Sequence, residues 1–166
     1  MKLQTKDIAT IGIMSALLIA IQVGLSFLPN IELVSLLIIL CTIFFGWKTL
    51  YIIYIFVLVE GLIYGFHIWW ISYLYVWTIL MLITMLFKHK KSPFFWAIVS
   101  GTYGLSFGVL CTIPYFFIGG MPLAISTFIT GIPFDIIHGV ANYIITLVLF
   151  KPLYIFFNWI YQKNYT

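Results

Sequence analysis

Eight lysines carry all of the positive charge of this chain, and each lies at an end of a long apolar stretch. They are Lys2, Lys6, Lys48, Lys88, Lys90, Lys91, Lys151 and Lys163. When the apolar stretches are taken as six membrane crossings, all eight lysines fall on one side. Because lysine is retained on the cytoplasmic side of membrane proteins, the pattern predicts that both termini face the cytoplasm.

The composition predicts an integral membrane protein. Hydrophobic residues make up 64% of the 166 residues and charged residues only 7%, far below the quarter that is usual in soluble domains. At roughly 20 residues per crossing, six helices with short connections nearly use up the length. We therefore expect an all-α fold, with residues 1–166 forming one six-helix transmembrane domain. The lysines then act as topological anchors, and no nucleic-acid partner is expected.

Turn residues and charges set the expected limits of the six spans. Pro29 and Asn30 predict a tight turn after the first span. Residues 115–131 are apolar, but Gly119, Gly120 and Pro122 interrupt them, and a crossing there would move the last two lysines outside. We expect this segment to be a loop with a short helix at the outer surface, and the tail to Thr166 to lie at the cytoplasmic interface. The expected spans are Ile8 to Leu28, Ile31 to Phe45, Thr49 to Phe66, Ser72 to Phe87, Phe94 to Ile113 and Pro133 to Phe150.

Small residues recur along the expected fifth span. Ser100, Gly101, Gly104 and Gly108 follow near-helical spacing. Stripes of this kind allow membrane helices to approach closely. We expect another helix to pack against this face.

Ionisable residues inside membrane spans are costly and are usually functional. Asp135, His138 and Asn142 are spaced by three and four residues, so they share one face of the last span. Glu60 lies towards the outer end of the third span. A polar stripe of this kind should face a cavity. The structural alternative is that Asp135 caps the helix while the other two hydrogen-bond to neighbouring helices.

Several polar and aromatic side chains map to the outer half of the bilayer, as expected of a pocket for an organic ligand. No lysine lies at this level, whereas Glu60 and Asp135 do, with Glu32 as a further candidate, so a neutral or cationic ligand is expected. The candidate binding residues are Glu60, Tyr64, His67, Trp70, Tyr73, Trp77, Asp135, His138 and Asn142.

Other chemistries have weaker motifs. The chain has no phosphate-binding loop of the form G-x-x-x-x-G-K-[ST], so it does not hydrolyse ATP by that route. Residues 104–108 match G-x-S-x-G, and with His138 they leave an intramembrane serine protease as an alternative; the hydrolase motif, however, requires a strand-to-helix turn. Cys41 and Cys111 lie in apolar runs and predict neither a disulfide nor a metal site. We expect no catalytic residues, no metal and no cofactor.

Two further motifs resemble the substrate-binding S components of energy-coupling factor (ECF) transporters, which take up vitamins in bacteria. Ala16 and Ala20 form an Ala-x-x-x-Ala pair in the first span, similar to the motif with which S components dock on their coupling subunit. Residues 131–138, followed by Asn142 and residues 151–153, are similar to the last-helix signature of several S components.

The resemblance implies a multi-pass protein of the bacterial cell membrane. It implies three partner chains, a membrane coupling subunit and two cytosolic ATPases, and a vitamin bound at the outer face. Cobalamin or a thiamine-like compound fits the expected charge, and pantothenate is possible. The short turn at Pro29 departs from members with a longer gating loop, so gating could fall to residues 115–131. A stand-alone secondary transporter remains an alternative, although no internal repeat is evident.

Overall fold

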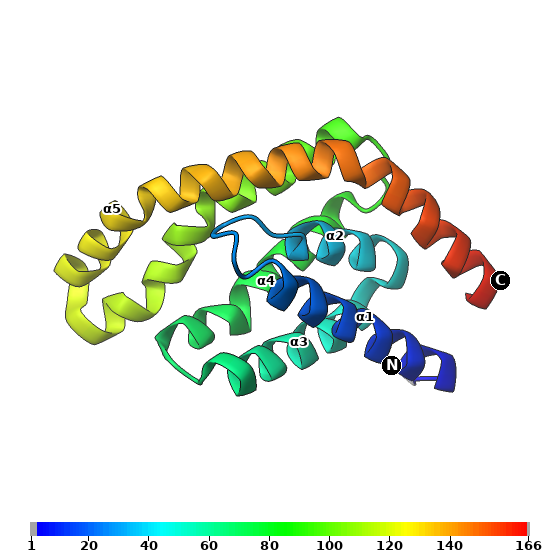
Figure 1. Cartoon of the computed structure of the whole chain (residues 1–166), viewed down its shortest axis with the longest axis horizontal. Helices are drawn as coiled ribbons and strands as arrows, with labels where there is room; N and C mark the ends of the chain where they lie inside the picture. Colours follow the sequence, from blue (N-terminus) through cyan, green and yellow to red (C-terminus); the bar gives the residue numbers. More distant parts are fainter. Residues whose placement is uncertain (1–2, 166) are drawn as a thin grey trace.

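The computed structural model describes residues 3–165, and in this part of the chain every regular element is a helix. A 3-10 turn, η1 (Gly46–Lys48), separates the second and third helices. The α-helices are α1 (Thr5–Gly24), α2 (Val34–Phe45), α3 (Thr49–Tyr64), α4 (Ile68–Phe87) and α5 (Pro93–Tyr165) (Figure 1). The predicted all-α fold class is confirmed.

Four helical stretches are long and apolar enough to cross a membrane. The outward faces of these helices carry large apolar side chains, among them Leu62, Leu86 and Phe117, which are 68, 77 and 80% exposed. Soluble proteins rarely expose contiguous apolar surface on this scale. The arrangement is compatible with a membrane protein whose helices face lipid. The four stretches are Thr5–Gly24, Val34–Tyr64, Ile68–Phe87 and Pro93–Lys163.

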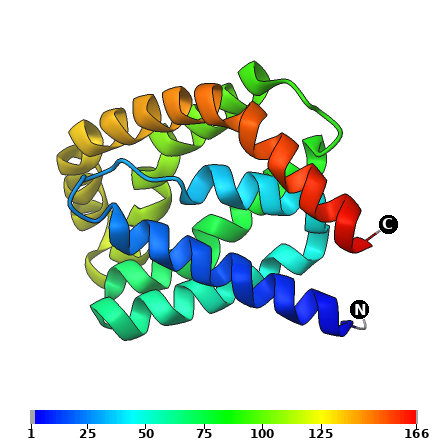
Figure 2. The same ribbon diagram turned by 45° about the vertical axis from the view of Figure 1, so that its right-hand side comes forward.

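Helix α5 consists of two arms that fold back on each other. The backbone leaves the helical region at Gly119 and Gly120, where Gly120 has a φ of 67°. Residues 93–118 and 121–165 then run antiparallel, as Figures 1 and 2 show. A Cβ atom added to Gly104 would lie 2.9 Å from the Cα of Gly139, so the predicted close approach at the small-residue stripe is confirmed. The expectation of a loop over 115–131 is corrected: only the two glycines depart from helical geometry.

Pro114 lies inside the first arm of α5 instead of ending it. A proline within a helix cannot donate to the carbonyl four residues earlier, here that of Leu110. The hydroxyl of Tyr75 donates to this carbonyl at 2.6 Å. A neighbouring helix therefore supplies the hydrogen bond that the proline cannot make, which offsets part of the cost of Pro114 inside the helix.

Helix α2 forms the centre of the bundle and packs against both α4 and α5. Ten of its twelve residues are buried. At 1.5 Å per residue it is about 18 Å long, whereas the 20 residues of α1 span about 30 Å. Residues 25–33, which connect α1 to α2, cross the bundle without helical structure. This connection is longer than the predicted turn, because α1 ends at Gly24 and α2 begins at Val34.

Both ends of the described chain lie at the same end of the bundle (Figure 2). The Nζ atom of Lys48 lies 2.6 Å from a carboxylate oxygen of Asp7. The ring of Tyr165 lies beneath Lys6 and Lys48, and its hydroxyl donates to Thr10. The predicted interfacial tail is therefore a continuation of α5 that packs on the bundle. Helices α1 and α3 both start at this lysine-rich end.

Candidate functional site

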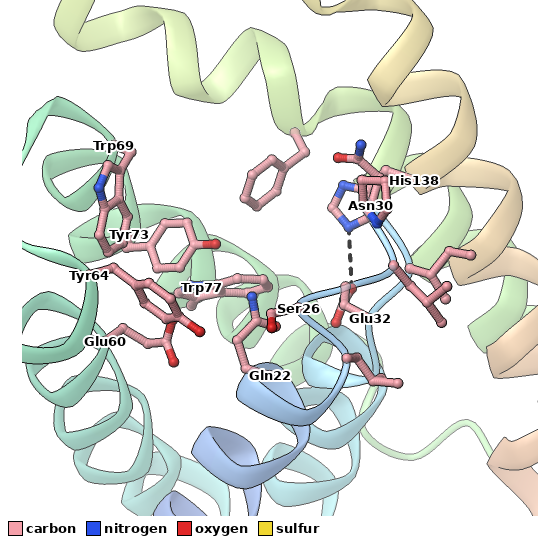
Figure 3. Close-up of a pocket in the computed structure, with 15 residues that line it drawn as sticks. Gln22, Ser26, Asn30, Glu32, Glu60, Tyr64, Trp69, Tyr73, Trp77 and His138 are labelled. Carbon is pink, nitrogen blue, oxygen red and sulfur yellow. Dashed lines mark hydrogen bonds and ion pairs between the residues drawn. The ribbon is translucent and has the colours of Figure 1, made fainter.

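A cavity of about 320 Å³ lies beyond the start of α2 (Figure 3), at the ends of α1 and α3 that are farther from the lysine-rich end. Its volume is at the small end of the range found for organic-ligand sites. The space exists because the central helix α2 is short and does not extend into it. Residues from α1, α3, α4, α5 and the 25–33 connection line it. The lining residues are Gln22, Leu25, Ser26, Leu28, Pro29, Asn30, Ile31, Glu32, Glu60, Tyr64, Trp69, Tyr73, Trp77, Phe107 and His138.

Aromatic rings from α4 and α5 form a connected wall of this cavity. Tyr73 makes edge-to-face contacts with Trp69, Trp77 and Phe107, at centroid distances of 5.0, 5.4 and 6.3 Å. Trp77 also packs against Phe107 at 5.5 Å. Because each ring fixes its neighbour, the wall is preorganised for a flat or cationic ligand.

Glu60 projects from α3 on one side of the cavity, next to Tyr64 (Figure 3). Its side chain is 2% exposed, and its Oε1 atom has no hydrogen-bond partner among the described residues. The indole Nε1 of Trp77, also buried, has none either. Buried polar atoms without partners are rare in native structures, so these two call for an explanation.

Glu32 and His138 form a pair on the other side of the cavity (Figure 3). His138 Nε2 lies 3.2 Å from Glu32 Oε1, and the second carboxylate oxygen of Glu32 accepts the amide N–H of Ser35 at 2.8 Å. Glu32 thus accepts a hydrogen bond from a backbone N–H in the buried first turn of α2, which has no partner within the helix. The pair also fastens the 25–33 connection to the return arm of α5.

Hydrogen bonding decides the protonation of Glu32. Burial alone would raise the pKa of this carboxyl, but the His138 ring and the Ser35 backbone and hydroxyl outweigh burial and hold its pKa below the ordinary value. Glu32 is therefore a carboxylate at neutral pH. With Glu60 on the facing wall and no lysine in the lining, the cavity disfavours anions.

Five of the nine sequence-predicted binding residues line the cavity. Four others do not: Trp70 donates its indole N–H to the Val57 carbonyl, and His67 lies on the outer surface. Asp135 accepts the amide N–H of Gly108 at 3.0 Å, between the arms of α5, and Asn142 donates to Ser35 at 3.2 Å. The five in the lining are Glu60, Tyr64, Tyr73, Trp77 and His138.

Sequence reasoning missed most of the lining contributed by the end of α1 and the connection after it. Gln22 and Ser26 are spaced by four residues near the outer end of the first span, which is the signal that could have found them. Glu32 was only a possible contributor, although it is one of just four acidic residues in the chain. Nothing in the sequence separates Trp69 from Trp70 or marks Phe107. The full set of missed polar and aromatic residues is Gln22, Ser26, Asn30, Glu32, Trp69 and Phe107.

The G-x-S-x-G stretch lies away from the cavity. The hydroxyl of Ser106 donates to the Thr102 carbonyl within the helix. Ser106 lines a separate outer groove with Ile79 and Ile83, while His138 is bound to Glu32 in the cavity. Ser106 and His138 therefore do not form the pair that a serine nucleophile requires.

The described part of the chain contains no cluster of side chains suited to bind a metal ion. Over residues 3–165, no group of three or more histidine, cysteine, aspartate or glutamate side chains is placed to hold an ion. Cys41 and Cys111 are both free thiols. The cavity thus offers aromatic faces, two carboxyl groups and a histidine for recognition of a ligand.

Comparison of the chain with protein-family models, with curated proteins and with solved structures gave no match to any of the three.

Proposed function

We propose that this protein is the substrate-binding S component of an ECF-type transporter and takes up a small neutral or cationic micronutrient. The cavity is the observation that carries the proposal. It lies within a bundle of helices whose outward faces are apolar, it is lined by aromatic and acidic groups, and it lies away from the lysine-rich end. A membrane protein with one such pocket and no ATPase motif is suited to deliver a ligand to a separate motor.

The proposed topology places six crossings in the membrane, formed by α1, α2, α3, α4 and the two arms of α5. The lysine-rich end, with both termini, faces the cytoplasm, as the positive-inside rule requires. The cavity then opens to the outside. In this arrangement α2 need not span the hydrocarbon core by itself, because the surrounding helices shield it from lipid.

A free face of α1 supports docking on a coupling subunit. Ala16 and Ala20 are both exposed, one turn apart. A Cβ atom added to Gly12, one turn earlier, would meet nothing within 4 Å. Small side chains on an open face allow another membrane helix to approach without loss of side-chain entropy.

The size of the cavity limits which substrates can bind. A corrinoid is much larger than a 320 Å³ space, so a compact thiamine-like ligand is favoured over cobalamin. Pantothenate is disfavoured, because its carboxylate would meet Glu60 and Glu32 and no cation.

Co-purification tests the function. The tagged chain is isolated from its native membrane in mild detergent, and the bound proteins are identified by mass spectrometry. We expect two ATPases and a membrane coupling subunit, with all three lost in the Ala16→Leu/Ala20→Leu variant. Thr102→Leu, at an exposed site on α5, is the matched control and should retain them.

Recovery of the chain alone, under conditions that keep a known ECF complex intact, refutes the proposal. Equal recovery of the partners with the double leucine variant would show that the Ala16 and Ala20 face of α1 is not the docking surface.

A further inference from the structure

We infer that the ligand is a compact planar nitrogen heterocycle that carries an amino group, the class that includes aminopyrimidines and amino-substituted purines. The inference rests on the proposed function, since it takes the cavity to be the substrate site. Two unpartnered polar atoms, the geometry of the aromatic wall and the distribution of charge each narrow the ligand independently.

Glu60 requires a hydrogen-bond donor from the ligand. Glu60 is 2% exposed, and its Oε1 atom is buried with no hydrogen-bond partner among residues 3–165, so this oxygen is a desolvated acceptor. The histidine of the cavity cannot serve it, because His138 is bound to Glu32 on the far side. A quaternary ammonium would bring charge but no N–H. An amino group supplies the N–H, and a protonated ring nitrogen supplies both the N–H and the charge.

Trp77 requires an acceptor. Its indole Nε1 is buried and without a partner, and Trp77 lies between the Glu60 side and the Glu32 side of the cavity (Figure 3). An anionic acceptor would be repelled by the Glu32 carboxylate. A neutral ring nitrogen or carbonyl oxygen fits, and nitrogen heterocycles with an amino substituent present such an acceptor close to their donor.

The walls select a flat ring. Trp69, Trp77 and Phe107 are all held in fixed orientation by Tyr73 through nearly perpendicular contacts, each with an interplanar angle of 83°. Aromatic faces held in this way bind a planar or cationic ring with little reorganisation. A cavity of about 320 Å³ has room for one or two fused rings. Aliphatic amino acids offer no planar ring face to match these walls.

Direct binding to the purified chain tests the inference. Isothermal titration in detergent compares 4-aminopyrimidine and adenine with their parent rings, pyrimidine and purine, and with choline. We expect binding by at least one aminated ring and at least tenfold weaker binding of its parent ring and of choline.

Two variants test whether Glu60 and Trp77 bind the ligand. Glu60→Gln should weaken binding of the aminated ring about 10- to 100-fold, the loss expected of a hydrogen bond to a charged group. Trp77→Phe should weaken it as well. Trp70→Phe is the matched control, because it also removes an indole N–H but from a residue bonded to Val57 outside the cavity. The unliganded Glu60→Gln protein should melt no lower than the parent, since the substitution removes a desolvated carboxylate.

The outcomes separate this inference from the proposed function. Absence of binding by both aminated rings, equal binding by choline or the parent rings, or unchanged affinity in a folded Glu60→Gln variant each overturns the ligand class. A chain that binds an aminated ring but never recovers the ATPases supports the ligand class and refutes the transporter. A chain that recovers the ATPases and binds none of the compounds supports the transporter and refutes the ligand class.

Discussion

The contact between the two arms of α5 makes a strong prediction about Gly104. A Cβ atom added here would lie 2.9 Å from the Cα of Gly139, and 3.0 Å from both the Gly139 nitrogen and the His138 carbonyl oxygen. Ordinary contact begins at 3.4 Å, and all three neighbours are backbone atoms that cannot rotate away. In Gly104→Ala the arms must therefore separate by about 0.5 Å, the difference between these distances.

Two opposing terms set the size of the effect. Overpacking of this kind costs about 1–3 kcal/mol. Alanine recovers about 1 kcal/mol over glycine in a helix interior. Gly12→Ala in α1 isolates the first term, because a Cβ there meets nothing within 4 Å and the helix propensity gain is the same. The two variants should thus differ in unfolding free energy by about 1–3 kcal/mol.

Thermal unfolding in detergent measures this difference. For a chain of this size about 2–4 °C corresponds to each kcal/mol, so Gly104→Ala should melt about 2–12 °C below Gly12→Ala. Intrinsic tryptophan fluorescence reports the transition. Equal melting temperatures for the two alanine variants would refute the close approach of the arms, and with it the position of His138 beside the cavity.

Three further predictions concern hydrogen bonds that the structure assigns. Glu32→Gln should lower the melting temperature at pH 7; because the pKa of Glu32 is lowered by folding, its contribution is present above the ordinary value of about 4.3 and is lost as the pH falls through the folded-state pKa. The difference from the parent should therefore shrink as the pH is lowered below about 4.3 in a fluorimetric pH series, and a constant difference would contradict the pairing. Lys48→Met should lower the melting temperature by leaving Asp7 without its ion-pair partner, and the drop should be smaller in an Asp7→Asn background; an equal drop there would disprove the coupling. Trp70→Phe should cost about 1 kcal/mol of stability through the lost bond to Val57, measured by chemical unfolding, and no loss would mean that this bond contributes nothing.

The sequence was most informative where one physical rule dominates. Burial in lipid demands helices, and the glycine spacing over residues 101–108 demands a close neighbour, so the fold class and the helix contact could both be predicted. The limits of the elements were harder. Pro114 is expected to end a helix by local rules, but the structure continues the helix, and the hydroxyl of Tyr75, from another helix, offsets the hydrogen bond lost there.

The candidate site was predicted in part for a similar reason. Helical spacing correctly places Asp135, His138 and Asn142 on one face, but spacing does not say what each meets. In the structure Asp135 meets the Gly108 amide, His138 meets Glu32 and Asn142 meets Ser35. Only the middle one reaches the cavity. These partners lie 27 to 107 residues away along the chain, which is beyond any local pattern.

Cysteine labelling in intact cells tests how the cavity and the lysines sit across the membrane. Ser26→Cys lies in the cavity lining and is exposed, and Lys90→Cys lies in the exposed connection between α4 and α5. The background is Cys111→Ser, since Cys41 is buried. A membrane-impermeant maleimide should label Ser26→Cys from outside and Lys90→Cys only after permeabilisation. Because the two sites lie at opposite ends of the bundle, labelling of both in intact cells would refute the transmembrane arrangement itself. Labelling of Lys90→Cys alone would instead invert it, and would place the cavity on the cytoplasmic side, where it could not capture a nutrient from outside.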